Sequence, residues 1–157
     1  MFEKQSRRNR NMMNLDHYTL FTTDFKDYEF YSEGPQGRIK KVVRYRRIED
    51  DPITYNLAFG DENEKGVVSD TVISDNRDKD MVLFTVANTI NAFCDHFGNH
   101  FVYAEGSTAA RTRLYQMGIG RLWKKISTDF DVWGYKDGSW QDFRVNVNYE
   151  AFLVKRK

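Results

Sequence analysis

The sequence has few of the residues that mark secreted, membrane-spanning or disordered proteins. Cys94 is the one cysteine among 157 residues, so the chain can form no internal disulfide, as is typical of reducing compartments. It has 2 prolines, 10 glycines and no low-complexity run, a composition unlike that of disordered chains. No apolar stretch reaches the roughly 18–20 residues that cross a bilayer. We therefore expect a folded cytoplasmic protein without a membrane partner.

An excess of charge of either sign is also absent. Lysine and arginine number 24 and aspartate and glutamate 23, which gives a net charge of +1. The total charge therefore encodes no attraction to DNA or to anionic membranes. Recognition of an anionic partner would have to come from the local distribution of charge.

Hydrophobic residues, by contrast, are plentiful enough for one packed core. They make up 40% of the chain, and aromatic residues make up 15%. A length of 157 residues fits one domain. The first residues are polar and basic, without apolar periodicity. We expect residues 1–14 to form a loose basic arm and residues 15–157 to form a single domain.

Alternation of apolar and polar residues predicts a β-meander in the first half of the chain. We expect strands over residues 28–33, 38–48, 53–59 and 67–74. A turn at residues 34–37, with glycine at both ends, connects the first two. The second strand places apolar residues at odd positions, and its even positions carry the cations Arg38, Lys40, Arg44 and Arg46.

Helical periodicity follows the meander. A helix over residues 78–97 is predicted by the apolar stripe Leu83, Val86, Ala87, Ile90, Cys94 and Phe97. A short strand over residues 101–104 then leads to a helix capped by Ser107 or Thr108. We expect an interruption of this helix at residues 118–120. Its buried stripe is predicted to be Ala110, Leu114 and Met117.

A C-terminal hairpin and strand complete the predicted fold. Asp137-Gly138 between aromatic-rich runs predicts a hairpin of strands 130–135 and 139–144, and a last strand covers residues 149–154. Strands grouped before and after the helices favour an α+β fold. The sequence thus predicts one α+β domain with an antiparallel or mixed sheet and helices packed on one face.

Four segments of the sequence resemble a small bacterial family of unknown function. They are 31–43, Tyr55-Asn56-Leu57-Ala58-Phe59-Gly60-Asp61, Gly106-Ser107-Thr108-x-Ala110-Arg111-Thr112-Arg113-Leu114-Tyr115 and 148–154. The resemblance covers the chain from about Tyr18 to its end. It implies a single domain and brings no catalytic residue with it.

The first candidate site is the turn that opens the second helix. Gly106, Ser107 and Thr108 precede Arg111 and Arg113 there. Unpaired backbone N–H groups at the positive end of a helix favour phosphate or another oxyanion, and arginine offers a matching fork of donors. If an anion binds, we expect Arg111 to contact it and Arg113 to form an ion pair with the rest of the domain. The alternative is purely structural: Ser107 or Thr108 caps the helix, and the arginines pair with acids such as Glu105 or Asp61.

The second candidate site is the row of cations Arg38, Lys40, Arg44 and Arg46 on one strand face. Such a row can follow a phosphate backbone, with nearby tyrosines stacking on bases. The alternative is a solvated sheet face whose cations discourage edge-to-edge pairing and are neutralised by the acidic residues 49–51.

Motifs of known catalytic or cofactor chemistry are missing from the sequence. The 3 histidines lack the spacing of metal ligands. Cys94 lies on an apolar helix stripe, as an inert core thiol does. We predict neither a metal nor a cofactor.

Three functions fit this sequence. The first is a binding module for a phosphate-bearing partner, with nucleic acid as the leading candidate, that uses both candidate sites. The second is a small metal-independent phosphodiesterase or ribonuclease in which an arginine stabilises the charged transition state. The third is a protein-interaction module, such as a homodimer, with exposed aromatic residues that include Trp133 and Trp140.

Overall fold

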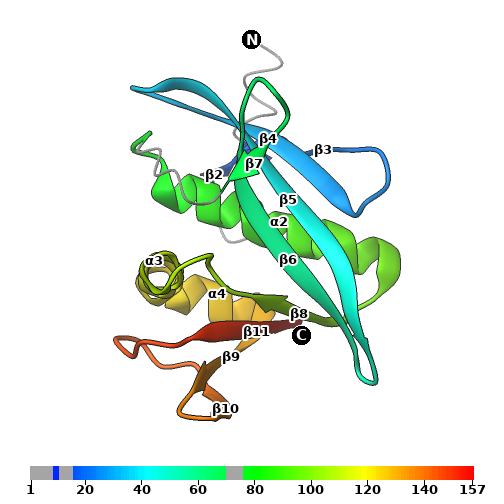
Figure 1. Ribbon diagram of the computed structural model, residues 1–157, viewed down its shortest axis with the longest axis vertical. Coiled ribbons are helices and arrows are strands. Elements are labelled where there is room, and N and C mark those ends of the chain that lie inside the picture. Colours follow the sequence, from blue (N-terminus) through cyan, green and yellow to red (C-terminus); the bar gives the residue numbers. More distant parts are fainter. Residues whose placement is uncertain (1–8, 11–15, 70–75) are drawn as a thin grey trace.

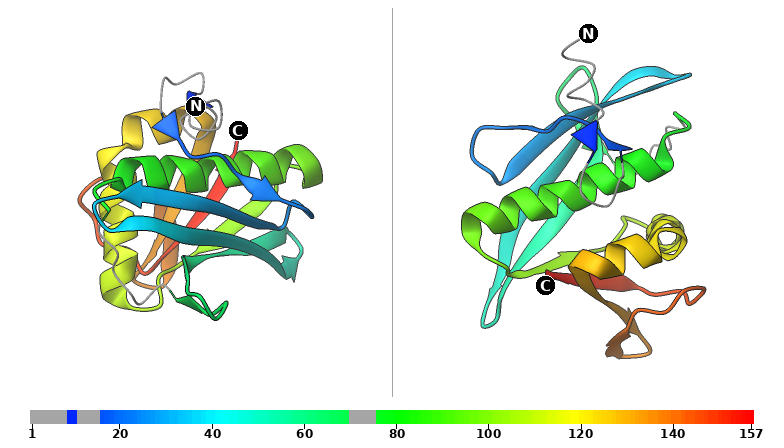
Figure 2. Two further views of the ribbon diagram at one scale, coloured as in Figure 1. Left: turned by 90° about the horizontal axis from the view of Figure 1, so that it is seen from above. Right: turned by 180° about the vertical axis from the view of Figure 1, so that it is seen from behind.

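The computed structural model describes residues 9–10, 16–69 and 76–157. A mixed sheet has the strand order β10-β9-β11-β8-β6-β5-β4-β3, with β7 beside β6. Helices α2 and α4 lie behind this sheet in Figure 1 and in front of it in the right panel of Figure 2. The predicted α+β fold with helices on one face is therefore confirmed.

The meander in the first half of the chain is longer than predicted. Its strands are β3 (Phe21–Thr22), β4 (Asp27–Gly34), β5 (Gly37–Asp50) and β6 (Ile53–Glu62). Of the predicted fourth strand, β7 covers Val68–Ser69, and residues 70–75 lie outside the described residues. In the predicted arm, β1 (Asn9–Arg10) pairs with β2 (Asp16–His17) of the predicted domain, and the remaining arm residues lie outside the described residues.

Helix α2 (Lys79–Phe97) forms where predicted, and its buried face overlaps the predicted stripe only in part. Ile90 and Cys94 of that stripe are buried, and its other members are partly buried against the core. The remaining buried residues, which lie off the predicted stripe, are Phe84, Thr85, Thr89 and Phe93. Hydrogen bonds explain the buried threonines. Thr85 Oγ1 accepts from the Tyr18 backbone N–H at 2.9 Å, and Thr89 Oγ1 bonds the Tyr45 hydroxyl at 2.7 Å. A threonine whose hydroxyl is satisfied can lie in the core.

Strand β8 (Phe101–Ala104) leads to α3 (Ala109–Arg121) and α4 (Trp123–Asp129). The predicted interruption at residues 118–120 is wrong, since α3 continues through both glycines and the break falls at Leu122. Gly118 faces α2, where an added Cβ would lie 3.2 Å from Leu83 Cδ2. The glycine thus allows α3 to approach α2 closely.

The predicted buried stripe of α3 is also wrong. Leu114 and Met117 are 44% and 49% exposed, and Ala110 is exposed as well. The fully buried residues of α3 are Thr112, Gln116 and Gly118, and Tyr115 and Ile119 pack against the core beside them. The fully buried side chains are small or polar, so periodicity of apolar residues could not identify them.

The C-terminal strands are β9 (Phe130–Lys136), β10 (Ser139–Asp142) and β11 (Ala151–Arg156). Asp137 and Gly138 adopt positive φ values of 51° and 80°, which confirms the predicted hairpin turn. Strand β11 lies between β8 and β9 and is antiparallel to both. Residues of the inner face, such as Val102 and Phe152, join the core beneath the helices.

Candidate binding surfaces on the open sheet face

The sheet face opposite α2 and α4 is the one toward the viewer in Figure 1. One row of side chains shows how the strands line up across this face. The pairing register joins Arg46, Asn56, Tyr103, Leu153, Trp133 and Asp142, which come from β5, β6, β8, β11, β9 and β10. The face therefore has two halves, a charged one on β3 to β6 and an aromatic one on β8 to β11.

The charged surface contains the predicted row of cations. We define it as Asp27, Glu29, Tyr31, Arg38, Lys40, Arg44, Arg46 and Glu62. Lys40 Nζ lies 2.9 Å from Glu29 Oε2 and 2.6 Å from Glu62 Oε2. These two carboxylates raise the pKa of Lys40, with Glu62 contributing more than Glu29. Arg44 Nη2 lies 3.6 Å from Glu62 Oε1.

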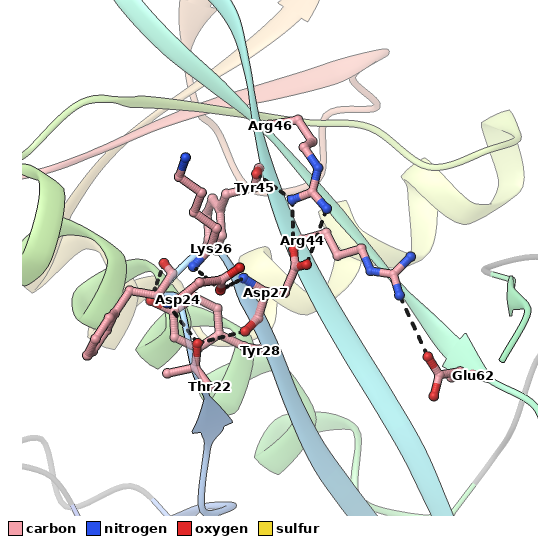
Figure 3. A network of polar contacts seen from close by, with 10 residues as sticks. Thr22, Asp24, Lys26, Asp27, Tyr28, Arg44, Tyr45, Arg46 and Glu62 are labelled. Atoms are coloured by element: carbon pink, nitrogen blue, oxygen red, sulfur yellow. Dashed lines mark hydrogen bonds and ion pairs between the residues drawn. The ribbon is translucent and has the colours of Figure 1, made fainter.

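Arg46 forms the best-defined pair of this surface (Figure 3). Its Nη1 donates to Asp27 Oδ1 at 2.7 Å and its Nη2 donates to Asp27 Oδ2 at 3.3 Å. This hydrogen-bonded carboxylate raises the pKa of Arg46. Arg38 instead stacks its guanidinium over the Tyr31 ring, 4.0 Å from the centroid.

The acids that neutralise this row come from strands β4 and β6. The sequence had pointed to residues 49–51 for that role, and the structure corrects this, because Asp50 pairs with Arg47 instead. Lys40, Arg44 and Arg46 each have a carboxylate partner on a neighbouring strand. A phosphate backbone would have to displace these carboxylates.

A cleft of about 310 Å³ lies at one end of the charged surface. It is lined by Asp24, Lys26, Asp27, Tyr45, Arg46, Arg47 and Tyr55. The Asp24 carboxylate accepts from the backbone N–H groups of Asp27 and Lys26, both at 2.9 Å, and these bonds lower its pKa. Most charges around the cleft are thus already engaged within the chain.

The turn before α3 is a closed helix cap. Thr108 Oγ1 accepts from the Arg111 N–H at 3.1 Å, so the capping role predicted for Ser107 or Thr108 is filled by Thr108. Thr112 Oγ1 accepts from the Gly106 N–H at 3.0 Å and donates to the Thr108 carbonyl at 3.1 Å. A Cβ on Gly106 would lie 2.6 Å from the Thr112 nitrogen. Glycine is therefore required at this position for the turn to pack on its own helix.

The two arginines of this turn differ in their surroundings. Arg111 is partly buried, and its Nε has no hydrogen-bond partner. Arg113 is exposed and forms no ion pair with any described residue, so the predicted pairing of Arg113 with the domain is wrong for the described chain. The acids proposed as partners bond elsewhere. Asp61 pairs with Lys41, and Glu105 accepts from the Tyr103 hydroxyl.

The two predicted sites do not come together. The row of cations Arg38, Lys40, Arg44 and Arg46 follows the open face of β5. Figure 1 shows α3, which the other candidate site precedes, beside the N-terminal end of α2. Strand β8 pairs with β6 only over Thr54–Asn56. The turn that follows β8 therefore lies beyond the paired segment and apart from the row on β5.

The aromatic surface covers the other half of the open face. We define it as Phe101, Tyr103, Trp133, Tyr135 and Trp140. Their rings contact one another, with centroid distances of 5.9 Å for Phe101–Trp133, 6.1 Å for Tyr103–Trp140 and 5.2 Å for Tyr135–Trp140. Trp140 is 41% exposed, and the other rings are partly exposed. Outward positions of an antiparallel sheet commonly hold polar residues, so five adjacent aromatic rings there are unusual.

Charged residues of both signs surround the aromatic surface. The acids are Glu105, Asp131, Asp142 and Glu150, and the cation is Lys155, which pairs in register with Asp131 across β9 and β11. Lys155 Nζ lies 5.1 Å from the centre of the Phe101 ring. Burial raises the pKa of Tyr103 to about 12, and the Glu105 carboxylate adds to this rise.

Sequence reasoning named Trp133 and Trp140 but missed the other three aromatic residues. The alternation of inward and outward residues along each strand could have identified them. Phe101 and Tyr103 flank the inward Val102, and Trp133 and Tyr135 flank Gly134, whose Cβ would enter the Tyr149 ring on the inner side. Residues two apart on a strand share a face.

A family model matches residues 14–157 and is described as a family of unknown function (DUF6934). Comparison with curated proteins and with solved structures finds no match. Within the described residues, no helix is long and apolar enough to cross a membrane. The match agrees with the resemblance inferred from the sequence, and the chain belongs to the family of unknown function DUF6934.

Proposed function

We propose that this chain is a protein-interaction module that pairs with a second copy of itself through the aromatic surface. The observation that carries the proposal is the set of adjacent aromatic rings on β8, β9 and β10, on the sheet face opposite the helices. Tryptophan and tyrosine are enriched among the residues that dominate binding energy in protein interfaces.

The arrangement of the rings favours a protein over a nucleic acid at this surface. Bases stack on exposed ring faces. Here Tyr103 and Trp140 meet at 83° and Tyr135 and Trp140 at 63°, so each pair covers part of one ring face with the edge of another. The surrounding carboxylates of Glu105, Asp131, Asp142 and Glu150 would also repel phosphates.

The charges around the aromatic surface favour a second copy as the partner. In a two-fold symmetric interface, residue i of one copy contacts residue j of the other, and residue j of the first copy contacts residue i of the second. Such an interface needs both signs of charge on one surface. Lys155 provides a cation and Asp131 and Glu150 provide anions around the same rings.

Sedimentation velocity over a series of protein concentrations tests the proposal. We expect the wild-type chain to change from monomer to dimer, and the double variant Tyr135→Ser/Trp140→Ser to remain monomeric at concentrations where the wild type is dimeric. Phe21→Ser is the matched control, because Phe21 is 47% exposed but lies beside the charged surface. A wild type that stays monomeric throughout, or a dimer that survives the double substitution, contradicts the proposal.

A second candidate function is the binding of a phosphate-bearing partner at the turn before α3. Arg111 and Arg113 favour it, because neither side chain has an ion-pair partner among the described residues. Titration with inorganic phosphate and with a single-stranded oligonucleotide tests it. Binding should weaken with added salt, because phosphate contacts release counterions, and should be lost in Arg111→Ala. The absence of salt-dependent binding to either probe rejects this function.

A further inference from the structure

Helix α3 leaves two large apolar side chains exposed to solvent. Leu114 and Met117 are 44% and 49% exposed, whereas the polar Thr112 and Gln116 are 3% and 4% exposed. Tyr115 and Ile119 of this helix pack against the core cluster, but Leu114 and Met117 do not. An ordinary amphipathic helix buries its apolar residues on one face, so a second apolar face that points outward is unusual.

The inward side of α3 explains how the helix stays in place without these apolar residues. Thr112 Oγ1 ties the helix to the Gly106 turn through two hydrogen bonds. Gly118 allows close contact with Leu83 of α2. The helix packs on the core through Tyr115 and Ile119 and on α2 through Gly118, so the outward apolar residues are not needed to hold it in place.

The outward residues form one continuous stripe. It consists of Ala110, Arg113, Leu114, Met117 and Arg121, which we call the α3 stripe. These positions are spaced by three or four residues, so they lie on one side of the helix. Isolated exposed apolar residues are normal on a protein surface, but here apolar residues recur at the spacing with which helices pack on one another.

The charges of α3 are all positive. The helix contains Arg111, Arg113 and Arg121 and no acidic residue. Arg113 forms no ion pair with any described residue, and Arg121 pairs with Asp80 in an exposed contact of 2.7 Å. In α4, Lys124 is exposed and adds a further cation close to the end of the stripe.

We infer that the α3 stripe is a docking site for an acidic amphipathic helix of another protein. Leu114 and Met117 would pack between apolar side chains of that helix, and its flanking glutamates or aspartates would pair with Arg113, which has no ion-pair partner among the described residues. A second copy of this chain does not fit, because two α3 helices would bring only like charges together. The stripe is separate from the aromatic surface, so this inference does not depend on the proposed self-association.

Charge complementarity and shape both favour an acidic helix over other anionic partners. Phosphate groups of a nucleic acid can pair with Arg113 but gain nothing from Leu114 and Met117 at the centre of the stripe. A lipid surface would gain from these two side chains, but α3 is a helix of 13 residues fixed to the protein along its other side. Stable membrane attachment needs a much larger apolar contribution.

Nuclear magnetic resonance on the full-length chain labelled with nitrogen-15 can test the inference. The probe is a synthetic helical peptide with leucines along one face and glutamates beside them, and the matched control peptide has lysines in place of the glutamates. We expect the acidic peptide to shift the amide signals of residues 110–121, and the basic peptide to leave them unchanged. Equal binding of both peptides, or no shift in α3 with the acidic one, overturns the inference.

Two variants separate the apolar from the electrostatic contribution. Leu114→Ser/Met117→Ser and Arg113→Glu should each weaken binding of the acidic peptide by about tenfold or more, which corresponds to about 1.4 kcal/mol. Trp140→Ser, on the aromatic surface, should bind like the wild type. Thermal melts check that each variant is folded, since substitutions on the surface change stability little.

An oligonucleotide and vesicles that contain phosphatidylserine serve as competing probes. Stronger binding to either of them than to the acidic peptide overturns the inference, particularly if that binding depends on Arg113 and not on Leu114 and Met117. Absence of selective binding of the acidic peptide to α3 would not change the sedimentation result for the aromatic surface. The two proposals are therefore tested independently.

Discussion

The charged and aromatic halves of the open sheet face follow the same strand geometry but differ in how their side chains are satisfied. On the charged half, Lys40, Arg44 and Arg46 each reach a carboxylate on a neighbouring strand. On the aromatic half, the rings contact one another and still leave apolar surface open to solvent. A row of cations in the sequence therefore does not mark a site when acids stand opposite it across the sheet.

The two halves also differ in the free energy that a binding partner can gain from them. Exposed ion pairs such as Arg46–Asp27 contribute only about 0–1 kcal/mol each. Burial of apolar surface contributes roughly 25 cal/mol per Å². A partner that covers the aromatic half consequently gains more than one that competes with the paired charges.

The largest effect is expected from Gly134→Ala, which disturbs the support beneath the aromatic surface. An added Cβ would lie 2.2 Å from Tyr149 Cδ1, inside the van der Waals limit. Overpacking of this kind costs about 1–3 kcal/mol, and we expect the upper end because Tyr149 is buried and bonded to Asp142 and Arg144. Urea unfolding measures the loss.

Gly120→Ala is the control for this substitution. A Cβ there would meet Val145 Cγ1 at 3.5 Å, an ordinary contact. Alanine also favours a helix over glycine by roughly 1 kcal/mol. The variant should be as stable as the wild type or more stable, and a loss equal to that of Gly134→Ala would contradict the packing explanation.

The next effect concerns the one buried ion pair described on the strands of the charged half. Lys41 is 6% exposed and its Nζ lies 2.5 Å from Asp61 Oδ1 on the inner face. Asp61→Asn leaves a buried ammonium beside a neutral partner, and we expect a loss of about 1–3 kcal/mol. Asp27→Asn removes an exposed partner and should cost less than about 1 kcal/mol. Equal losses in thermal melts would show that burial does not set the strength of these pairs.

The fold could be predicted from the sequence where the pattern of apolar residues alone decides the structure. Alternation in β5 and β6 correctly placed Tyr45 and Tyr55 in the core and the even-numbered cations of β5 on the open face. The Asp137-Gly138 turn was predicted from its residue types. The buried faces of α2 and α3 were not, because Thr85, Thr89 and Thr112 are buried through hydrogen bonds to residues distant in sequence or to a turn.

The candidate site was less predictable for a topological reason. Trp133 and Trp140 were recognisable as exposed aromatic residues. Their grouping with Phe101 and Tyr103 depends on β11 lying between β8 and β9, and periodicity contains no information about the order of strands. A surface assembled from three strands therefore became visible only in three dimensions.

A smaller, pH-dependent effect is expected at Tyr103. Its folded-state pKa is raised from 10 to about 12, chiefly by burial, so the neutral phenol stabilises the fold. This contribution is fully present below pH 10 and is lost as the pH rises from 10 through 12. Tyr103→Phe should therefore lose less stability than the wild type across this range in unfolding experiments. Parallel pH profiles of the two proteins would contradict the assignment.

The smallest effect is expected from the charged surface itself. Arg46→Ala removes an exposed pair whose two side chains are 57% and 44% exposed. Stability should change by less than about 1 kcal/mol, and the sedimentation behaviour should match that of the wild type. A dimer that dissociates in Arg46→Ala would move the interface to the charged half.

Hydroxyl-radical footprinting at low and high protein concentration tests the central claim most directly. Oxidation of Trp133, Tyr135 and Trp140 should fall as the protein associates, while Phe21 beside the charged surface and Phe25, which stacks on His96 of α2, should be oxidised equally at both concentrations. Unchanged oxidation of the aromatic surface, or protection of Phe21 instead, would contradict the claim that this half of the sheet is the interface.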